Sequence, residues 1–152
     1  MTLDEIDLGI VHQLQNNARL SNKELAARVG LAPSTTLVRT RQLERAGVLR
    51  GYRAEVDPRA LGIGLQALIS VRLRQHTAEV VAVFRDHVLA MPQVMRLYHV
   101  AGEDDFLIHV GVKDSEALRE LAMNSLTTRP EVAHIETGLI FECVEGGGED
   151  MS

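Results

Sequence analysis

The sequence predicts an α+β protein with two domains: an N-terminal helix-turn-helix domain, winged-helix-like in plan, and a C-terminal ferredoxin-like domain of βαββαβ order. Two observations predict this fold class. Apolar residues recur at helical spacing in three short segments near the N-terminus, and strand-like and helix-like patterns then alternate up to residue 144. We expect the domains at 1–50 and 65–145, a strand and linker at 51–64, and a disordered tail at 146–152.

Capping residues mark the three N-terminal helices. Asp4 is the expected cap of the first helix, which ends at Asn16-Asn17. The block 21–24 has the capping-box pattern that begins the second helix, and Gly30 suits its left-handed end. Pro33 fits the first turn of a third helix that runs to Ala46. Two helices joined by a tight glycine turn predict a helix-turn-helix, although a purely structural three-helix bundle has the same pattern.

The third helix has no clean apolar stripe. One packing places Thr36, Thr40 and Leu43 inward, and another places Leu37 and Ala46 inward. Periodicity alone leaves both packings open.

Charge is distributed unevenly along the chain. The net charge is -5, yet residues 1–60 hold nine basic and seven acidic residues, whereas 61–152 hold seven and fourteen. Residues 34–53 contain five arginines against Glu44 alone. A local basic patch on an acidic molecule fits phosphate binding, and a solvated helix face is the alternative interpretation.

The second half of the chain has the pattern of an antiparallel sheet with two helices. Residues 51–56 alternate like a strand, and 57–62 read as a capped turn. The elements that follow are a strand at 65–73, a helix at 78–90, strands at 94–101 and 106–112, a helix at 114–126 and a strand at 132–144. With both helices on one face, the other face of the sheet needs a cover, and homodimerisation is the simplest one.

An acidic loop lies between the two central strands of this pattern. Gly102 precedes three consecutive carboxylates, Glu103, Asp104 and Asp105. Carboxylates can accept an ammonium group and free backbone N–H groups a carboxylate, and these are the two ends of an amino acid. A plain polar turn is the alternative.

Two histidines and one cysteine are the candidate metal ligands of the chain. His99 and His109 would face each other if the turn centres on Asp104, but no third ligand accompanies them, so we expect interface residues and no metal. Cys143 lies in an apolar stretch and is expected to be packing. No nucleophile elbow, Walker loop or dinucleotide motif is present, so neither a cofactor nor an enzyme is predicted.

The remaining features predict a cytoplasmic protein. No apolar run approaches the roughly 20 residues of a membrane span. Asp4, Glu5 and Asp7 argue against a signal peptide, and a single cysteine cannot form an internal disulfide.

Several collinear blocks carry a family resemblance. They are 3–14, 19–25, 29–31 and 39–52, together with the loop Val100-Ala101-Gly102-Glu103-Asp104-Asp105-Phe106. These blocks closely resemble the leucine-responsive/asparagine regulator (Lrp/AsnC) family of transcription regulators, and the resemblance covers nearly the whole chain. Ala32 stands where the family usually has serine, and Thr36 and Thr40 stand where it has aliphatic residues, which suggests looser packing.

The resemblance implies the site residues. It favours the packing with Thr36, Thr40 and Leu43 inward. The face left outward would enter the major groove of double-stranded DNA. The expected DNA-binding residues are Ser34, Thr35, Val38, Arg39, Arg41, Gln42 and Arg45. The effector-binding residues implied are Val100, Gly102, Glu103, Asp104, Asp105 and Thr137.

The resemblance also implies the partners. The strand at 51–56 would pair with its copy in a homodimer, and dimers would form higher, octamer-like rings. The function predicted is a sequence-specific DNA-binding transcription regulator that responds to a small effector, an amino acid or a related metabolite. The alternatives are a DNA-wrapping architectural protein without an effector and a small ferredoxin-like enzyme that would use the 103–105 carboxylates.

Overall fold

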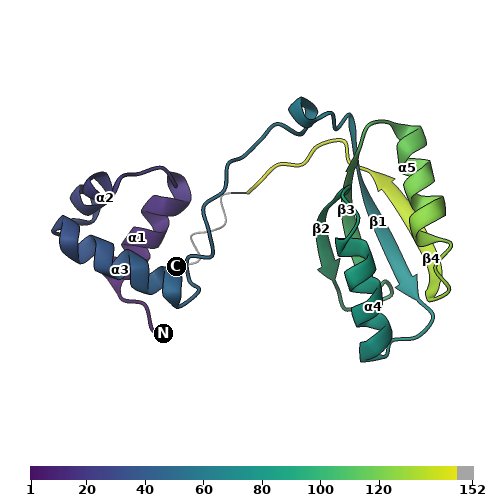
Figure 1. The fold of residues 1–152 in the computed structure, drawn as a ribbon, viewed down its shortest axis with the longest axis horizontal. Helices are drawn as coiled ribbons and strands as arrows, with labels where there is room; N and C mark the ends of the chain where they lie inside the picture. Colours follow the sequence, from purple (N-terminus) through teal and green to yellow (C-terminus); the bar gives the residue numbers. More distant parts are fainter. Residues whose placement is uncertain (147–152) are drawn as a thin grey trace. The chain divides into compact units, whose positions relative to one another are not determined.

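The computed structural model describes residues 1–146 and divides into two compact units (Figure 1). The first unit is Met1–Glu55, and the second begins at Val56. No helix in residues 1–146 is long and apolar enough to cross a membrane.

The first unit is a bundle of three helices, α1 (Glu5–Asn16), α2 (Asn22–Val29) and α3 (Pro33–Arg45). Its core is formed by Ile10, Leu14, Leu25 and Leu43. Asp4 and Asp7 make a reciprocal capping box at the start of α1, and Ser21 and Glu24 make the same box at α2. The helix boundaries expected from capping residues are therefore confirmed to within one residue.

The packing of α3 is the one that the family resemblance implies. Thr36 and Leu43 are fully buried and Thr40 is half-buried, whereas Leu37 is exposed. Ala32 supplies no side-chain cap. Instead, the Thr36 hydroxyl donates to the carbonyl of Ala32 at 3.0 Å, and the Thr40 hydroxyl donates to the carbonyl of Thr36 at 2.9 Å. The two inward hydroxyls are thus satisfied inside the helix.

The second unit is a four-stranded antiparallel sheet of order β2-β3-β1-β4. Its elements are η1 (Pro58–Leu61), β1 (Leu65–Leu73), α4 (Ala78–Leu89), β2 (Val94–His99), β3 (Phe106–Val112), α5 (Ser115–Leu121), η2 (Ala122–Leu126) and β4 (Val132–Leu139). Both helices cover one face of the sheet (Figure 1). Phe84 of α4 packs on Phe106 of β3 with ring centroids 5.2 Å apart. This is the expected βαββαβ ferredoxin-like order.

The second sheet face has a different composition. Because opposite residues of antiparallel strands share a face, register places Gln66, Leu68 and Ser70 of β1 on it, with His109 and Leu107 of β3 alongside. Its outer strands add Arg96, Tyr98, His134 and Glu136. Neither helix packs on these residues, so the face is uncovered and mostly polar.

The strands expected at 51–56 and at 132–144 differ from the structure. Residues 51–56 form no strand, because no strand within residues 1–146 pairs with them. The last strand ends at Leu139, not at 144, because β1 begins at Leu65 and only Gln66 remains to accept a bond, from the N–H of Ile140. Cys143 is consequently exposed and is not packed in a strand.

The helix expected at 114–126 is α-helical only to Leu121. It then widens into η2, a π-helical turn. The expected tail begins at Gly146, and its residues 147–152 lie outside the described part of the chain.

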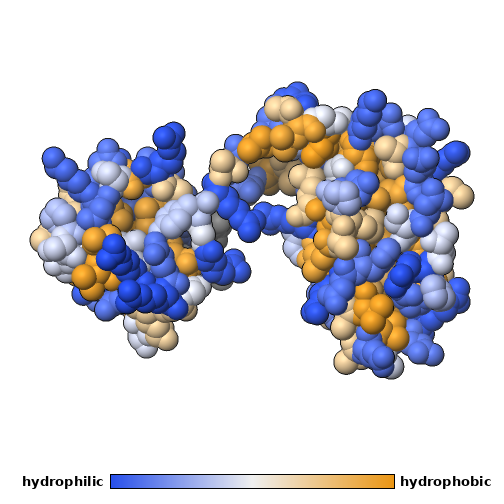
Figure 2. Space-filling model, viewed as in Figure 1, coloured by the Kyte–Doolittle hydropathy of each residue, from blue (hydrophilic) through white to orange (hydrophobic). Residues whose placement is uncertain are grey.

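Figure 2 shows apolar atoms gathered over the segment around η1, where Leu61 and Val56 are exposed.

Candidate DNA interface and ligand loop

The outward face of α3 carries most of the expected DNA-binding residues. Six side chains are exposed at positions that recur every three or four residues along one helix face: Ser34, Thr35, Val38, Arg41, Gln42 and Arg45. Val38 is 56% exposed, although an aliphatic side chain is usually drawn inward. The face thus combines two cations, hydrogen-bonding groups and one apolar contact, which suits both phosphates and base edges.

Arg39 is the exception among these residues. One guanidinium nitrogen lies 2.7 Å from Asp4 Oδ2 and 3.1 Å from Asp7 Oδ1, and the side chain is mostly covered. The hydrogen bond from Arg39 holds the pKa of the Asp4 carboxyl below its ordinary value, and that of Arg39 is raised by the same contacts. Arg39 therefore ties α3 to the cap of α1 and is engaged within the unit, unlike the six exposed side chains.

The turn between α2 and α3 fixes the position of the outward face. Gly30 adopts a φ of 71°, a left-handed conformation that other residues rarely accept, and closes α2. The side-chain amide of Asn22 then donates to the carbonyl of Pro33 at 2.7 Å. The start of α3 is in this way fastened to the start of α2.

The segment after α3 is also tied back to the helix. The N–H groups of Val48 and Leu49 donate to the carbonyl of Leu43, and Tyr52 donates its hydroxyl to Glu44 at 2.8 Å. Burial, reinforced by Glu44, raises the pKa of Tyr52 to about 12, so the phenol remains protonated. Sequence reasoning assigned no role to Tyr52, because spacing does not reveal that the chain turns back at Gly47.

The acidic loop is held by one of its own carboxylates. Asp105 is buried, and its Oδ2 accepts a hydrogen bond from the backbone N–H of Leu73 at 2.6 Å. His76 Nδ1 lies 2.6 Å from the other oxygen. The N–H of Asp105 also donates to the carbonyl of Val71. Asp105 is therefore an anchor between the loop and the end of β1, and both of its carboxylate oxygens have partners within the subunit. Its expected role in effector binding stays a prediction.

The other two carboxylates of the loop differ from each other. Glu103 is exposed and lies 3.3 Å from Arg72. Asp104 is half-buried and forms no ion pair with any residue of 1–146. Gly102 has a φ of 124°, which favours glycine, and the N–H of Val100 donates to the carbonyl of Asp105. Of the three carboxylates expected to crowd the loop, Glu103 and Asp105 thus have partners, and within residues 1–146 Asp104 alone has no ion pair.

Thr137 lies apart from this loop within one subunit. Register pairs it with Ile69, and β3 and β4 lie on opposite sides of β1. Neighbouring strands are about 4.8 Å apart, so two strand spacings, roughly 10 Å, separate Thr137 from β3. The subunit alone does not bring the loop and Thr137 together.

The two histidines do not oppose each other. His99 pairs with Phe106, and their rings stack with centroids 4.7 Å apart. His109 instead pairs with Arg96 and bonds to the Gln66 side chain at 2.7 Å. The expected facing pair was wrong because the hairpin turn is centred between Gly102 and Glu103 and not on Asp104, so that His99 and His109 lie three residues out of register.

A three-helix unit that presents a polar, basic helix face, followed by a ferredoxin-like unit with an open sheet face, defines a helix-turn-helix regulator with a separate ligand-binding domain. Residues 3–50 match the family model of winged helix-turn-helix DNA-binding domains. Residues 66–147 match the family model of the Lrp/AsnC ligand binding domain. The chain belongs to the Lrp/AsnC family of transcriptional regulators.

Individual relatives agree with this assignment. The chain is 44% identical to the HTH-type transcriptional regulator AldR of Mycolicibacterium smegmatis over 95% of its own length and 84% of that protein. It is 34% identical to the leucine-responsive regulatory protein of Escherichia coli, over 94% and 87% of the two chains. A transcriptional regulator of Neisseria meningitidis, solved as a complex with L-Met, superposes with a TM-score of 0.88 at 33% identity, covering 95% and 94%. The protein is accordingly a DNA-binding transcription regulator with a ligand-binding domain.

Proposed function

We propose that this regulator reads DNA with the outward face of α3 while its second unit assembles subunits and responds to an amino acid. The observation that carries the DNA-binding part is the exposure of Val38 together with Arg41, Gln42 and Arg45 on one helix face. A major groove admits an α-helix with its side chains.

The residues of α3 divide into two roles. Arg41 and Arg45 bind phosphates, because long exposed cations supply the sequence-independent part of the affinity. Ser34, Thr35, Val38 and Gln42 choose the sequence: Gln42 can bond adenine at two positions, and Val38 can contact a thymine methyl. Arg39 supports them by holding α3 on α1.

The uncovered sheet face supports a homodimer. It combines hydrogen-bonding residues such as Gln66 and His109 with Leu68, Leu107 and Tyr98, a mixture of the kind found in protein interfaces. The segment 51–56 alternates in sequence but has no partner strand within residues 1–146, and it would pair with its copy in the same dimer. Higher, ring-like assemblies would follow from contacts between dimers.

The loop at 100–105 is the proposed effector site. Asp104 offers a carboxylate without an ion-pair partner, and Gly102 provides a fixed turn with exposed backbone. Because Thr137 lies two strands away, a site that uses both needs a neighbouring subunit, and ligand binding would then bias assembly. The L-Met complex of the Neisseria meningitidis relative supports an amino acid as the ligand class.

A binding assay with and without ligand tests this function. A sequence selection on random DNA should recover a pseudo-palindrome, and the spacing of its half-sites should match a dimer. A thermal-shift screen of the amino acids should then find a ligand that stabilises the native state and changes the mass of the oligomer. Uniform protection of long DNA that no amino acid changes would favour an architectural role instead.

A further inference from the structure

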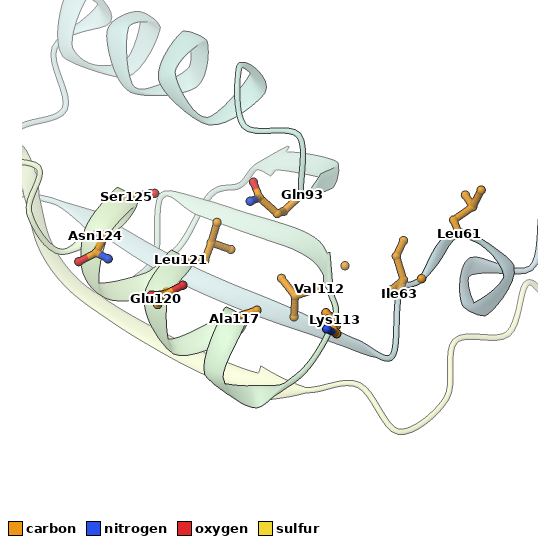
Figure 3. Close-up of a pocket in the computed structure, with 12 residues that line it drawn as sticks. Leu61, Ile63, Gln93, Val112, Lys113, Ala117, Glu120, Leu121, Asn124 and Ser125 are labelled. Atoms are coloured by element: carbon orange, nitrogen blue, oxygen red, sulfur yellow. The ribbon is translucent and has the colours of Figure 1, made fainter.

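A pocket of about 520 Å³ lies in the second unit, away from the acidic loop (Figure 3). Its walls are the connection between η1 and β1, the last residues of β3, and the helix formed by α5 and η2. The pocket adjoins β3 at Gly111–Lys113, whereas the loop precedes the other end of that strand at Phe106. The two sites therefore lie at opposite ends of β3, and all of the pocket belongs to one subunit.

The wall formed by the η1–β1 connection is held firmly against β3. The N–H of Gly64 donates to the carbonyl of Val112 at 3.0 Å. A Cβ at Gly64 would stand 2.5 Å from the carbonyl oxygen of Lys113, so no larger residue fits there without moving the backbone. This close approach keeps Ile63 beside the end of β3 and makes the pocket a fixed feature of the unit.

The floor of the pocket is apolar and its rim is polar. Val112 and Leu121 are each 5% exposed and form the floor with the half-buried Ile63. Along the helix, Ala117, Glu120, Leu121 and Asn124 follow one another at helical spacing and face the pocket together. An apolar base with a few placed polar groups is the usual composition of a small-molecule site.

The rim carries one cation and one anion without partners. Lys113 and Glu120 both line the pocket, and neither forms an ion pair within residues 1–146, with each other or with any other side chain. Neither charge is therefore neutralised by an ion pair, and both remain available to a ligand. A ligand with one negative charge, one positive charge and an apolar part would contact Lys113, Glu120 and the apolar floor of the pocket.

The helix on this wall has an unusual geometry. Asn124 and Ser125 lie in the π-helical turn η2, where the backbone is wider than in an α-helix. Such turns are rare and occur frequently at functional sites. The carbonyl of Ser125 is bonded by His87 of α4 at 2.7 Å, which holds the turn in place.

We propose that this pocket is a second binding site, for a free aliphatic amino acid, complete within each subunit. Lys113 binds the carboxylate, Glu120 binds the ammonium group, and the side chain lies on Ile63, Val112 and Leu121. The site shares only its ligand class with the proposed function, because it requires neither the acidic loop nor a neighbouring subunit.

The test uses the full-length protein and calorimetric titration with L-leucine and L-methionine. Wild type should bind two equivalents per subunit. Lys113→Met and Glu120→Gln should each weaken binding at one of them by about tenfold or more, since each removes the protein charge that pairs with one charge of the ligand. The matched control is Glu116→Gln, an exposed carboxylate of α5 outside the pocket, which should bind like wild type. Leucinamide and 4-methylpentanoate keep the leucine side chain but each lack one charge, and they should fail to fill the pocket.

A loop variant separates this inference from the proposed function. Asp104→Asn should remove the other equivalent and leave the pocket filled. If Asp104→Asn alone abolishes binding while Lys113→Met and Glu120→Gln bind like wild type, the pocket proposal is wrong and the loop stands. If only the pocket variants lose binding, the proposal of an effector site at the loop is wrong and the pocket proposal stands. Equal binding of leucine, leucinamide and 4-methylpentanoate, or no binding of either amino acid, overturns the pocket proposal.

Discussion

Replacing Asp105 tests whether the acidic loop is anchored by a buried carboxylate. In the structure, Asp105 accepts the N–H of Leu73 at 2.6 Å and faces His76 at the same distance. The change Asp105→Ala removes both contacts and leaves the N–H of Leu73 without an acceptor at the end of a core strand. We therefore expect a loss of stability in the second unit before any effect on ligand binding is considered.

The size of the loss follows from the burial of each partner. A hydrogen bond to a charged acceptor, lost inside the protein, costs about 1.5–3 kcal/mol. The ion pair adds little, because the His76 side chain is 62% exposed and exposed pairs contribute only about 0.2–1 kcal/mol. The expected destabilisation is thus about 2 kcal/mol, which corresponds to a fall in Tm of roughly 8–16 °C for a domain of this size.

Calorimetric melting of the full chain at one fixed protein concentration measures this effect, since assembly also shifts Tm. Asp105→Asn keeps an oxygen that can accept from Leu73 and should lose less than half as much. His76→Ala and Asp104→Ala are the matched controls and should stay within about 1 and 0.5 kcal/mol of wild type. A melting temperature of Asp105→Ala that is equal to those of the controls would refute the anchoring role.

Four further outcomes are expected. Arg41→Ala and Arg45→Ala should each weaken DNA binding evenly across sequences and reduce the slope of affinity against salt by about one; an unchanged slope in both would contradict the phosphate role. Arg39→Met should lower the melting temperature of the first unit, and DNA affinity should recover at low temperature as the helices refold; a stable variant that still fails to bind would make Arg39 a DNA contact. Burial, with Arg96 nearby, lowers the pKa of His109 below 6.5, so its contribution to stability is complete above that pH and is lost as pH falls towards the lowered value. In urea titrations, His109→Gln should flatten the decline of the unfolding free energy on the acid side, and an unaltered decline would show that His109 is not its source. A fragment starting at Gly64 should remain oligomeric by light scattering, and a folded monomer would contradict assembly through the sheet.

The features of the fold that could be predicted from the sequence depend on residues close together in the chain. The limits of α1 and α2 follow from Asp4, Ser21 and Gly30, because capping groups act within one turn. The strands at 65–73 and 106–112 were placed correctly because each alternates over a buried face.

The errors concern contacts made over long distances in the sequence. His76 meets Asp105 and Arg39 meets Asp4 and Asp7, and no local pattern links these positions. His109 pairs with Arg96 and not with His99, because the hairpin turn is centred between Gly102 and Glu103 and the sequence pattern did not locate that centre. The packing of α3 was ambiguous because threonines occupy its inward positions, and the family resemblance resolved it where periodicity did not.

The polar character of the uncovered sheet face has a consequence for how the protein is made. Side chains such as Gln66, Ser70 and Glu136 are well hydrated, so a newly synthesised subunit can complete its fold in water before it meets a partner. An apolar face of the same size would have to be covered during folding or would aggregate. In the homodimer proposed above, association would depend on matching hydrogen-bonding groups, which a different sheet of similar shape would leave unpaired. Such a face would favour a copy of the same chain over a related regulator.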